Sequence, residues 1–152
     1  MSTVREKEGL TYGIYARLEG FTKDEQGHVR IMTFFAPDKV VQGLNSTFRE
    51  IENLYRKGVT KDEVEKFKVI LGTQQTMLQD SIGRLLSDLH SYHFQDYTIA
   101  EMEARKAELD NVTITDINRV IKEYLDPTLF SVSGAGPINS LKAELKAWHR
   151  DV

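Results

Sequence analysis

An arginine and a tyrosine near the start of the chain carry the side chains best suited to binding a peptide. Arg5 and Tyr12 lie on either side of Gly9 in the stretch VREKEGLTYGIYARLEG, residues 4–20. We expect Arg5 near the end of a helix and Tyr12 one or two residues into a strand, because Gly9 allows a sharp reversal between them. An arginine fork can bind a peptide carbonyl or a carboxylate. A tyrosine hydroxyl can donate to a developing oxyanion.

The same pair also has a purely structural interpretation. Arg5 could form an ion pair with a nearby glutamate. Tyr12 shares the even-numbered, apolar face of its strand with Leu10 and Ile14, so it could be a core residue, as structural tyrosines are common. From spacing alone, the structural interpretation is the favoured one.

Four histidines remain for metal or acid–base chemistry, namely His28, His90, His93 and His149. His90 and His93 lie three residues apart in DLHSYHF and would share one face of a helix. Zinc needs three or four ligands, and neither H-E-x-x-H nor H-x-x-E-H occurs in the sequence. We therefore expect no metal site in this chain, with one histidine packed at a helix boundary and the other solvated.

The composition excludes several classes of function. The absence of cysteine removes disulfides, thiolate metal sites and cysteine nucleophiles. A net charge of −3 gives no general attraction to nucleic acid or anionic lipid, and no apolar run approaches the roughly 18 residues that span a membrane. The proportions of apolar and charged residues are those of a soluble globular protein, and they do not indicate a compartment.

Hydrophobic periodicity predicts the first half of the fold. Alternation over Leu10–Leu18 predicts a strand, and the β-forming run Val29–Phe35 predicts a second strand that pairs with it as an antiparallel hairpin. A stripe of apolar residues at helical spacing follows. Pro37 suits the first turn of that helix, and Gly58 suits the position just past its end.

Start signals place the later helices. Threonine followed three residues later by an acidic residue predicts three helix starts, at Thr60, Thr98 and Thr113. Ser81 begins a further helix. We predict a third strand over Thr128–Gly136 and a final amphipathic helix over Leu141–Trp148.

This order of elements predicts an α+β fold, in which a small antiparallel sheet has helices packed on one face. No linker or repeat interrupts residues 1–152, so we expect a single domain. Three strands make little sheet for so many helices, and their edges need cover. We therefore expect that strands belonging to this domain precede the chain.

Three segments resemble the pitrilysin family of zinc peptidases. VREKEGLTYGIYA resembles the family signature LR-x-x-x-GL-x-Y, GVTKDEVEKFKVILG resembles one of its helix openings, and VTITDINRVIKEYLDPTLFSVSGAGP resembles its closing helix and strand. Together they cover the sequence from Val4 to Pro137 in the family's order.

The resemblance implies a function for the arginine and tyrosine. Members are built from homologous α+β halves, of which the first binds zinc through H-x-x-E-H and the second supplies an arginine and a tyrosine to the substrate. Arg5 and Tyr12 match that pair, so the chain resembles a truncated second half that lacks its first strands and most of its first helix. Arg5 would bind the substrate backbone, Tyr12 would donate to the scissile carbonyl, and zinc would reside in a partner half or subunit.

The resemblance also sets expectations about partners. The chain alone should not hydrolyse peptides, and exposed sheet edges should favour self-association. Expected partners are a peptide or protein substrate and a zinc-bearing half. Two alternatives remain: a non-catalytic assembly subunit of the same fold, and an unrelated ferredoxin-like binding domain.

Overall fold

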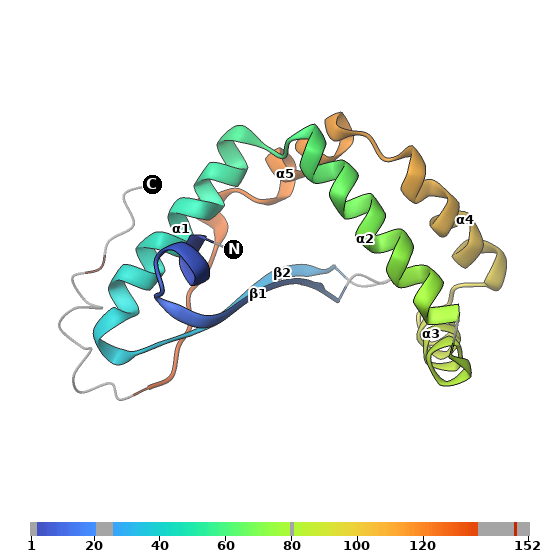
Figure 1. Cartoon of the computed structure of the whole chain (residues 1–152), viewed down its shortest axis with the longest axis horizontal. Helices are drawn as coiled ribbons and strands as arrows, with labels where there is room; N and C mark the ends of the chain where they lie inside the picture. Colours follow the sequence, from blue (N-terminus) through green and yellow to red (C-terminus); the bar gives the residue numbers. More distant parts are fainter. Residues whose placement is uncertain (1–2, 21–25, 80, 137–147, 149–152) are drawn as a thin grey trace. The chain divides into compact units, whose positions relative to one another are not determined.

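The described part of the chain combines a short β-hairpin with five α-helices (Figure 1). The computed structural model describes residues 3–20, 26–79, 81–136 and 148. The elements in chain order are η1 (Thr3–Lys7), β1 (Thr11–Glu19), β2 (His28–Phe35), η2 (Pro37–Lys39), α1 (Val40–Lys57), α2 (Lys61–Gln79), α3 (Ile82–Phe94), α4 (Ile99–Asn111), α5 (Ile114–Tyr124) and η3 (Pro127–Leu129). This mostly helical arrangement around a two-stranded antiparallel sheet confirms the α+β class.

Two compact units are formed within the chain. The first lies within Met1–Glu19, Gly27–Gly58 and Val120–Val152, and the second within Gly20–Gln26 and Val59–Arg119. The boundary falls inside α5. The prediction of one domain over residues 1–152 stays a prediction.

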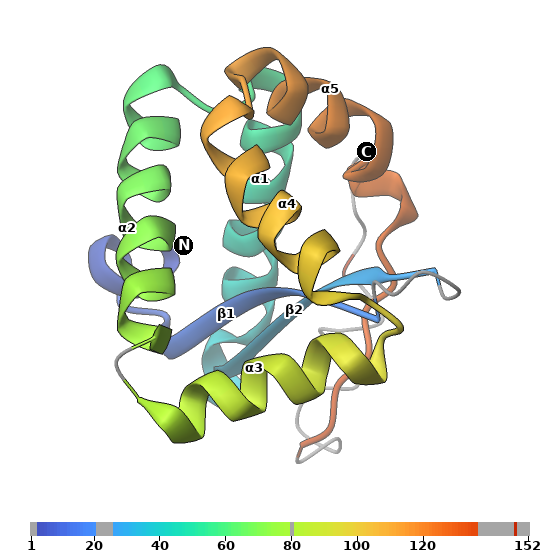
Figure 2. The same cartoon turned by 90° about the vertical axis from the view of Figure 1, so that its right-hand side faces the viewer.

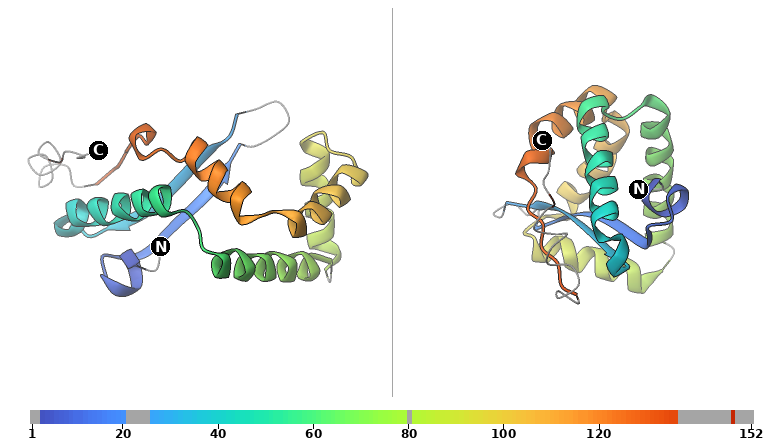
Figure 3. Two further views of the ribbon diagram at one scale, coloured as in Figure 1. Left: turned by 90° about the horizontal axis from the view of Figure 1, so that it is seen from above. Right: turned by 90° about the vertical axis from the view of Figure 1, so that its left-hand side faces the viewer.

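The first unit packs one face of the hairpin against α1, which lies alongside it (Figure 3). Its buried apolar centre contains Val4 and Leu10 from the N-terminal segment and Ile14 from β1, with Ile31 and Phe35 of β2 packed against it. Further buried side chains come from α1 and α5, namely Phe48, Ile51 and Ile121. This core fixes the position of the N-terminal turn that carries Arg5.

Helix α1 begins and ends where the sequence predicts. Pro37 opens the short turn η2 that leads into it. At the other end Gly58 adopts a φ of 69°, and its N–H donates to the Leu54 carbonyl at 2.8 Å. Glycine tolerates this left-handed conformation without a steric penalty, which explains why the helix ends there.

The second unit contains α2, α3, α4 and the first part of α5, and α3 contacts both α2 and α4 (Figure 2). Each predicted capping box has formed: Thr60 exchanges hydrogen bonds with Glu63, Thr98 with Glu101, and Thr113 with Asp116. Ser81 is the N-cap residue of α3. The three capping boxes are therefore encoded locally, whereas the Ser81 side chain makes no capping hydrogen bond.

The predicted third strand over Thr128–Gly136 is wrong. Asp126 accepts hydrogen bonds from the backbone N–H and the hydroxyl of Thr128, at 2.9 and 2.8 Å, which holds Pro127–Leu129 in a 3₁₀ turn. The residues that follow, up to 136, form no ladder, so the sheet has two strands over the described chain.

The predicted helix over Leu141–Trp148 lies outside the described residues, except for Trp148. The indole N–H of Trp148 donates to Asn45 Oδ1 at 2.7 Å, and its ring lies 5.6 Å from that of Phe48. Over the ranges that the structure covers, no helix has both the length and the hydropathy that a bilayer crossing requires.

Candidate functional site

A β-bulge in β1 determines where Tyr12 points. Thr11 is opposite Phe35, but Ile14 is opposite Thr33, so β1 has one residue more than β2 over this stretch. An extra residue changes the phase of a strand. Thr11 and Ile14 are therefore both buried, whereas Tyr12 between them is 91% exposed. The interpretation of Tyr12 as a core residue is wrong, because strict alternation does not hold across the bulge.

Two threonine hydroxyls satisfy the backbone of the bulge. Thr11 Oγ1 accepts from the Gly13 N–H at 3.2 Å and lies within donating distance of the Phe34 and Gly13 carbonyls, at 2.6 and 2.9 Å. Thr33 Oγ1 lies 3.2 Å from both Thr11 Oγ1 and the Gly13 carbonyl. This small network lets a residue with no ladder partner remain ordered.

Replacing Thr11 with valine should destabilise the protein by about 1–2 kcal/mol. Valine keeps the shape of the buried side chain but leaves the Gly13 N–H without an acceptor, and an unpaired buried donor costs about 1–3 kcal/mol. Urea unfolding measures the loss. Thr33→Val should cost less, since Thr33 only donates to this network; equal stability of Thr11→Val and the wild type would exclude the proposed support.

The Gly9 bend brings Arg5 to Tyr12. Gly9 has a φ of 61°, and the chain reverses there between η1 and β1. The guanidinium carbon of Arg5 lies 5.7 Å from the centroid of the Tyr12 ring, within the range of a cation–π contact. The two side chains that the sequence singles out are thus neighbours.

Both side chains keep their polar groups available. Arg5 and Tyr12 are exposed, and no carboxylate within the described ranges forms an ion pair with Arg5. The expected alternative pairing of Arg5 with a glutamate is therefore not seen there. Stacking on the ring orients the guanidinium without using its N–H donors.

A carboxylate behind the site attaches the N-terminal turn to α1. Glu8 accepts hydrogen bonds from the Ser46 hydroxyl and the Arg49 guanidinium, and Arg49 also donates to Ser46 Oγ at 3.0 Å. The Ser46 hydrogen bond, aided by Arg49, lowers the pKa of Glu8 below its ordinary value of 4.5. Lys39 Nζ donates to the Gly9 carbonyl at 3.3 Å, which supports the bend itself.

The Glu8 contacts predict a dependence of stability on acid. A carboxylate whose pKa is lower in the folded state stabilises the fold above its unfolded pKa, and this contribution is lost as the pH falls through the folded value. Wild type should therefore exceed Glu8→Gln in unfolding free energy at pH 7, and the gap should close well below pH 4.5. Glu52→Gln, a charge-matched change on α1, is the control; a Glu8 gap that persists in acid contradicts the assignment.

His90 and His93 are the candidate metal ligands in the sequence. The ring of His90 stacks on Phe94 with centroids 6.5 Å apart, and both His90 and His93 are exposed. Among the residues that the structure describes, no group of three or more His, Asp or Glu side chains could hold a metal ion. The donor set of this region does not fit zinc.

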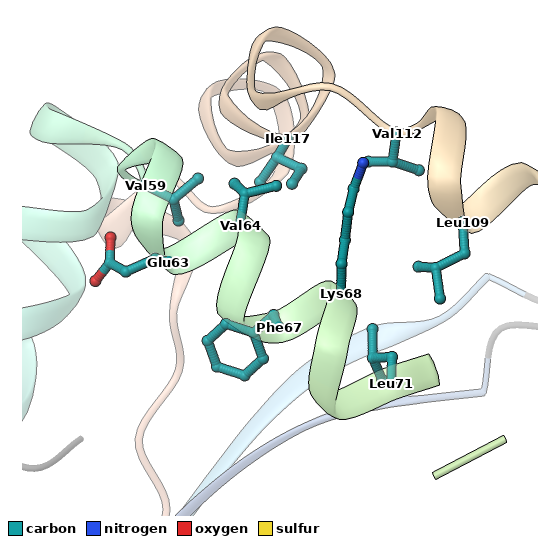
Figure 4. A pocket seen from close by; sticks show the side chains of 9 residues that line it. All are labelled: Val59, Glu63, Val64, Phe67, Lys68, Leu71, Leu109, Val112 and Ile117. Atoms are coloured by element: carbon teal, nitrogen blue, oxygen red, sulfur yellow. The ribbon is translucent and has the colours of Figure 1, made fainter. Parts of the chain in front are cut away.

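An apolar cavity of about 260 Å³ lies within the second unit (Figure 4). Its lining is formed by α2 and by the segment from Leu109 to Ile117, and Glu63 and Lys68 are its only charged residues. Glu63 is engaged with Thr60, and Lys68 Nζ donates to the Asp110 carbonyl at 2.7 Å. With its charged groups already bonded, this cavity offers packing space and no evident chemistry.

Comparisons with known proteins found a matching family model and a similar solved structure. Residues 1–71 match the family model described as Peptidase M16 inactive domain. No curated protein matches the sequence. Among solved structures, the chain is similar to the crystal structure of a conserved protein from Enterococcus faecalis V583, with 26% identity and a TM-score of 0.63 over 80% of this chain.

The comparison also shows a difference in length. The chain spans 28% of the length of that Enterococcus faecalis protein. The family match contains η1, the hairpin and α1, and therefore contains Arg5 and Tyr12. This match to a peptidase M16 inactive domain over residues 1–71 supports the resemblance to the half of such peptidases that lacks the zinc motif.

Proposed function

We propose that this chain is the substrate-binding, non-zinc half of a zinc metalloendopeptidase. The observation that supports the proposal is the exposed Arg5–Tyr12 pair, held together at 5.7 Å by the Gly9 bend and the bulge in β1. The match of residues 1–71, which include both side chains, to an inactive peptidase domain also supports the proposal. The zinc ion, which would supply an activated water, belongs to a partner half or subunit in this proposal.

Each of the two residues has a distinct task. Arg5 presents several N–H donors in one plane, which suits the carbonyls of an extended peptide backbone. Tyr12 donates from its hydroxyl to the oxygen of the scissile carbonyl, and this bond strengthens as negative charge develops there. The positive charge of Arg5, which contacts the Tyr12 ring, further stabilises the negative charge on that oxygen. The pair therefore binds the peptide and stabilises the transition state, without itself providing a nucleophile.

Reconstitution with a zinc-bearing subunit tests the proposal. The chain alone should not hydrolyse a fluorogenic peptide, whereas its complex with a subunit containing H-x-x-E-H should do so. Arg5→Ala should raise the KM of the complex without weakening subunit association. Chelator-sensitive hydrolysis by the repurified chain alone would contradict the assignment to a non-zinc half.

A scaffold subunit of the same fold is the second candidate. It is favoured by the apolar side chains that the helices expose, including Phe67 on α2 at 62%, Leu86 on α3 at 66% and Ile99 on α4 at 64%, since such side chains form association sites where they adjoin one another. Stable association with the zinc-bearing subunit, combined with hydrolysis that is indifferent to Arg5 and Tyr12, would support the scaffold instead.

A further inference from the structure

The hairpin has a second, uncovered face that begins at the Arg5–Tyr12 site. We call it the outer face and define it by six residues, Tyr12, Tyr15, Arg17, Arg30, Met32 and Phe34. We infer that the outer face binds an extended peptide with a large apolar side chain at one position and an acidic side chain two positions later. The inference rests on the proposed function and names the class of substrate.

The first part of the outer face is apolar. Tyr12, Phe34, Tyr15 and Met32 are 91%, 71%, 51% and 41% exposed. Tyr15 is directly opposite Met32, and the bulge residues are opposite Phe34. Single exposed apolar residues are common, but adjoining ones on one sheet face form a patch of the kind that binds partners.

Gly13 leaves space for one of these rings, that of Tyr15, beside the bulge. A Cβ atom added at Gly13 would lie 2.9 Å from Cε2 of Tyr15 and 3.0 Å from its hydroxyl oxygen. The Tyr15 ring therefore lies back along the strand toward Tyr12, in the space that the missing side chain leaves. An apolar side chain bound beside the Arg5–Tyr12 pair would meet this ring first.

The second part of the outer face has an excess of positive charge. Arg17 is directly opposite Arg30, and like charges in this arrangement are unfavourable. Arg30 is relieved by Glu19, whose Oε2 lies 3.3 Å from its guanidinium. Within the described part of the chain no carboxylate pairs with Arg17. A carboxylate from a ligand would complement it.

The spacing of the two parts fits a peptide strand. Tyr15 and Arg17 are two residues apart on one face, about 6.6–6.8 Å along the strand. An extended peptide running beside them repeats its own side chains at the same interval. Further strands would pair at the edges of the hairpin and would not cover this face, while α1 covers the opposite face. Additional strands would therefore leave the outer face open.

Binding of short labelled peptides to the 152-residue chain tests the inference. The probes are three capped Gly/Ser peptides containing Phe-Gly-Asp, Phe-Gly-Lys or Ala-Gly-Asp, measured by fluorescence anisotropy. Phe-Gly-Asp should bind about fivefold more tightly than Phe-Gly-Lys, since a surface ion pair contributes up to about a fivefold change. It should also bind more tightly than Ala-Gly-Asp, which lacks the large apolar side chain. Arg17→Glu should reverse the order of the Asp and Lys peptides. Arg56→Glu, the same charge change on α1, should preserve it.

The variants separate the two proposals. Arg17→Gln should remove the Asp preference without reversing it, and Tyr15→Thr should reduce the Phe preference while keeping a β-forming residue. If all three peptides bind the wild type equally and Arg5→Ala weakens all of them, the Arg5–Tyr12 site stands and the outer-face inference is overturned. If none binds the wild type, both the inference and the peptide-binding function are rejected.

Discussion

Replacing Tyr12 with phenylalanine should lower the kcat of peptide hydrolysis by about 10²–10³-fold when the chain is assembled with a zinc-bearing subunit. Loss of one donor to a developing oxyanion costs about 2.7–4 kcal/mol of transition-state stabilisation. Phenylalanine keeps the aromatic ring, so the contact with the Arg5 guanidinium at 5.7 Å remains possible. The KM should change much less than kcat, because the hydroxyl bond is strongest after charge has developed.

A second tyrosine provides the matched control. Tyr55 lies on α1 in the same unit, where Lys122 Nζ stacks over its ring at 4.3 Å. Tyr55→Phe removes a hydroxyl and preserves that stacking, so kcat/KM should stay at the wild-type value. Unchanged kcat/KM for Tyr12→Phe in an active assembly would reject the role of Tyr12 as an oxyanion donor.

Replacing Gly43 with valine should destabilise the protein by about 3 kcal/mol. Gly43 lies on α1 where the helix crosses Phe35 of β2. A Cβ atom added there would lie 2.5 Å from Cδ1 and 2.6 Å from Cζ of the Phe35 ring, and closer still to Cε1. The ring belongs to the packed centre of the first unit, so it cannot move without cost, and overpacking of this kind typically costs about 1–3 kcal/mol or more. Urea unfolding measures the change.

Gly72 gives the comparison for this change. It lies within α2, and no atom comes within 4 Å of a Cβ added there. Gly72→Val should change stability by less than about 0.5 kcal/mol, because valine is a slightly better helix former than glycine. Phe35→Leu should rescue part of the Gly43→Val loss. Equal losses at Gly43 and Gly72 would show that backbone propensity, and not the Phe35 contact, decides the outcome.

The elements that the sequence predicts correctly are those encoded by neighbouring residues. Thr60 and Glu63 satisfy each other's backbone donors within one turn, so this helix start requires no distant partner. The same holds for the glycine that ends α1. The proximity of Arg5 and Tyr12 is also largely local, since it follows from one glycine bend between a helical turn and a strand.

Features that depend on partners distant in sequence were not predictable. The extra residue in β1 becomes evident only when the residues of β1 are paired with those of β2. In the sequence alone, the apolar character of Tyr12 continues the alternating pattern and so conceals it. The segment after Pro127 has the composition of a strand, but a strand also needs a neighbour, and Asp126 commits its first residues to a turn. Local sequence preference shows where a bulge or a strand could form. Pairing with a segment distant in sequence determines whether it does form.

The bulge makes β1 tolerant of one kind of genetic change and intolerant of another. An exchange of one amino acid for another leaves the residue count of the strand intact, so each half keeps its orientation toward or away from α1. Loss of the Gly13 codon would also keep this orientation, because Thr11 and Ile14 would then be two residues apart and would still share one face, with Tyr12 on the other. Loss of a codon farther along β1 would instead turn every side chain on one side of the deletion to the opposite face of the hairpin.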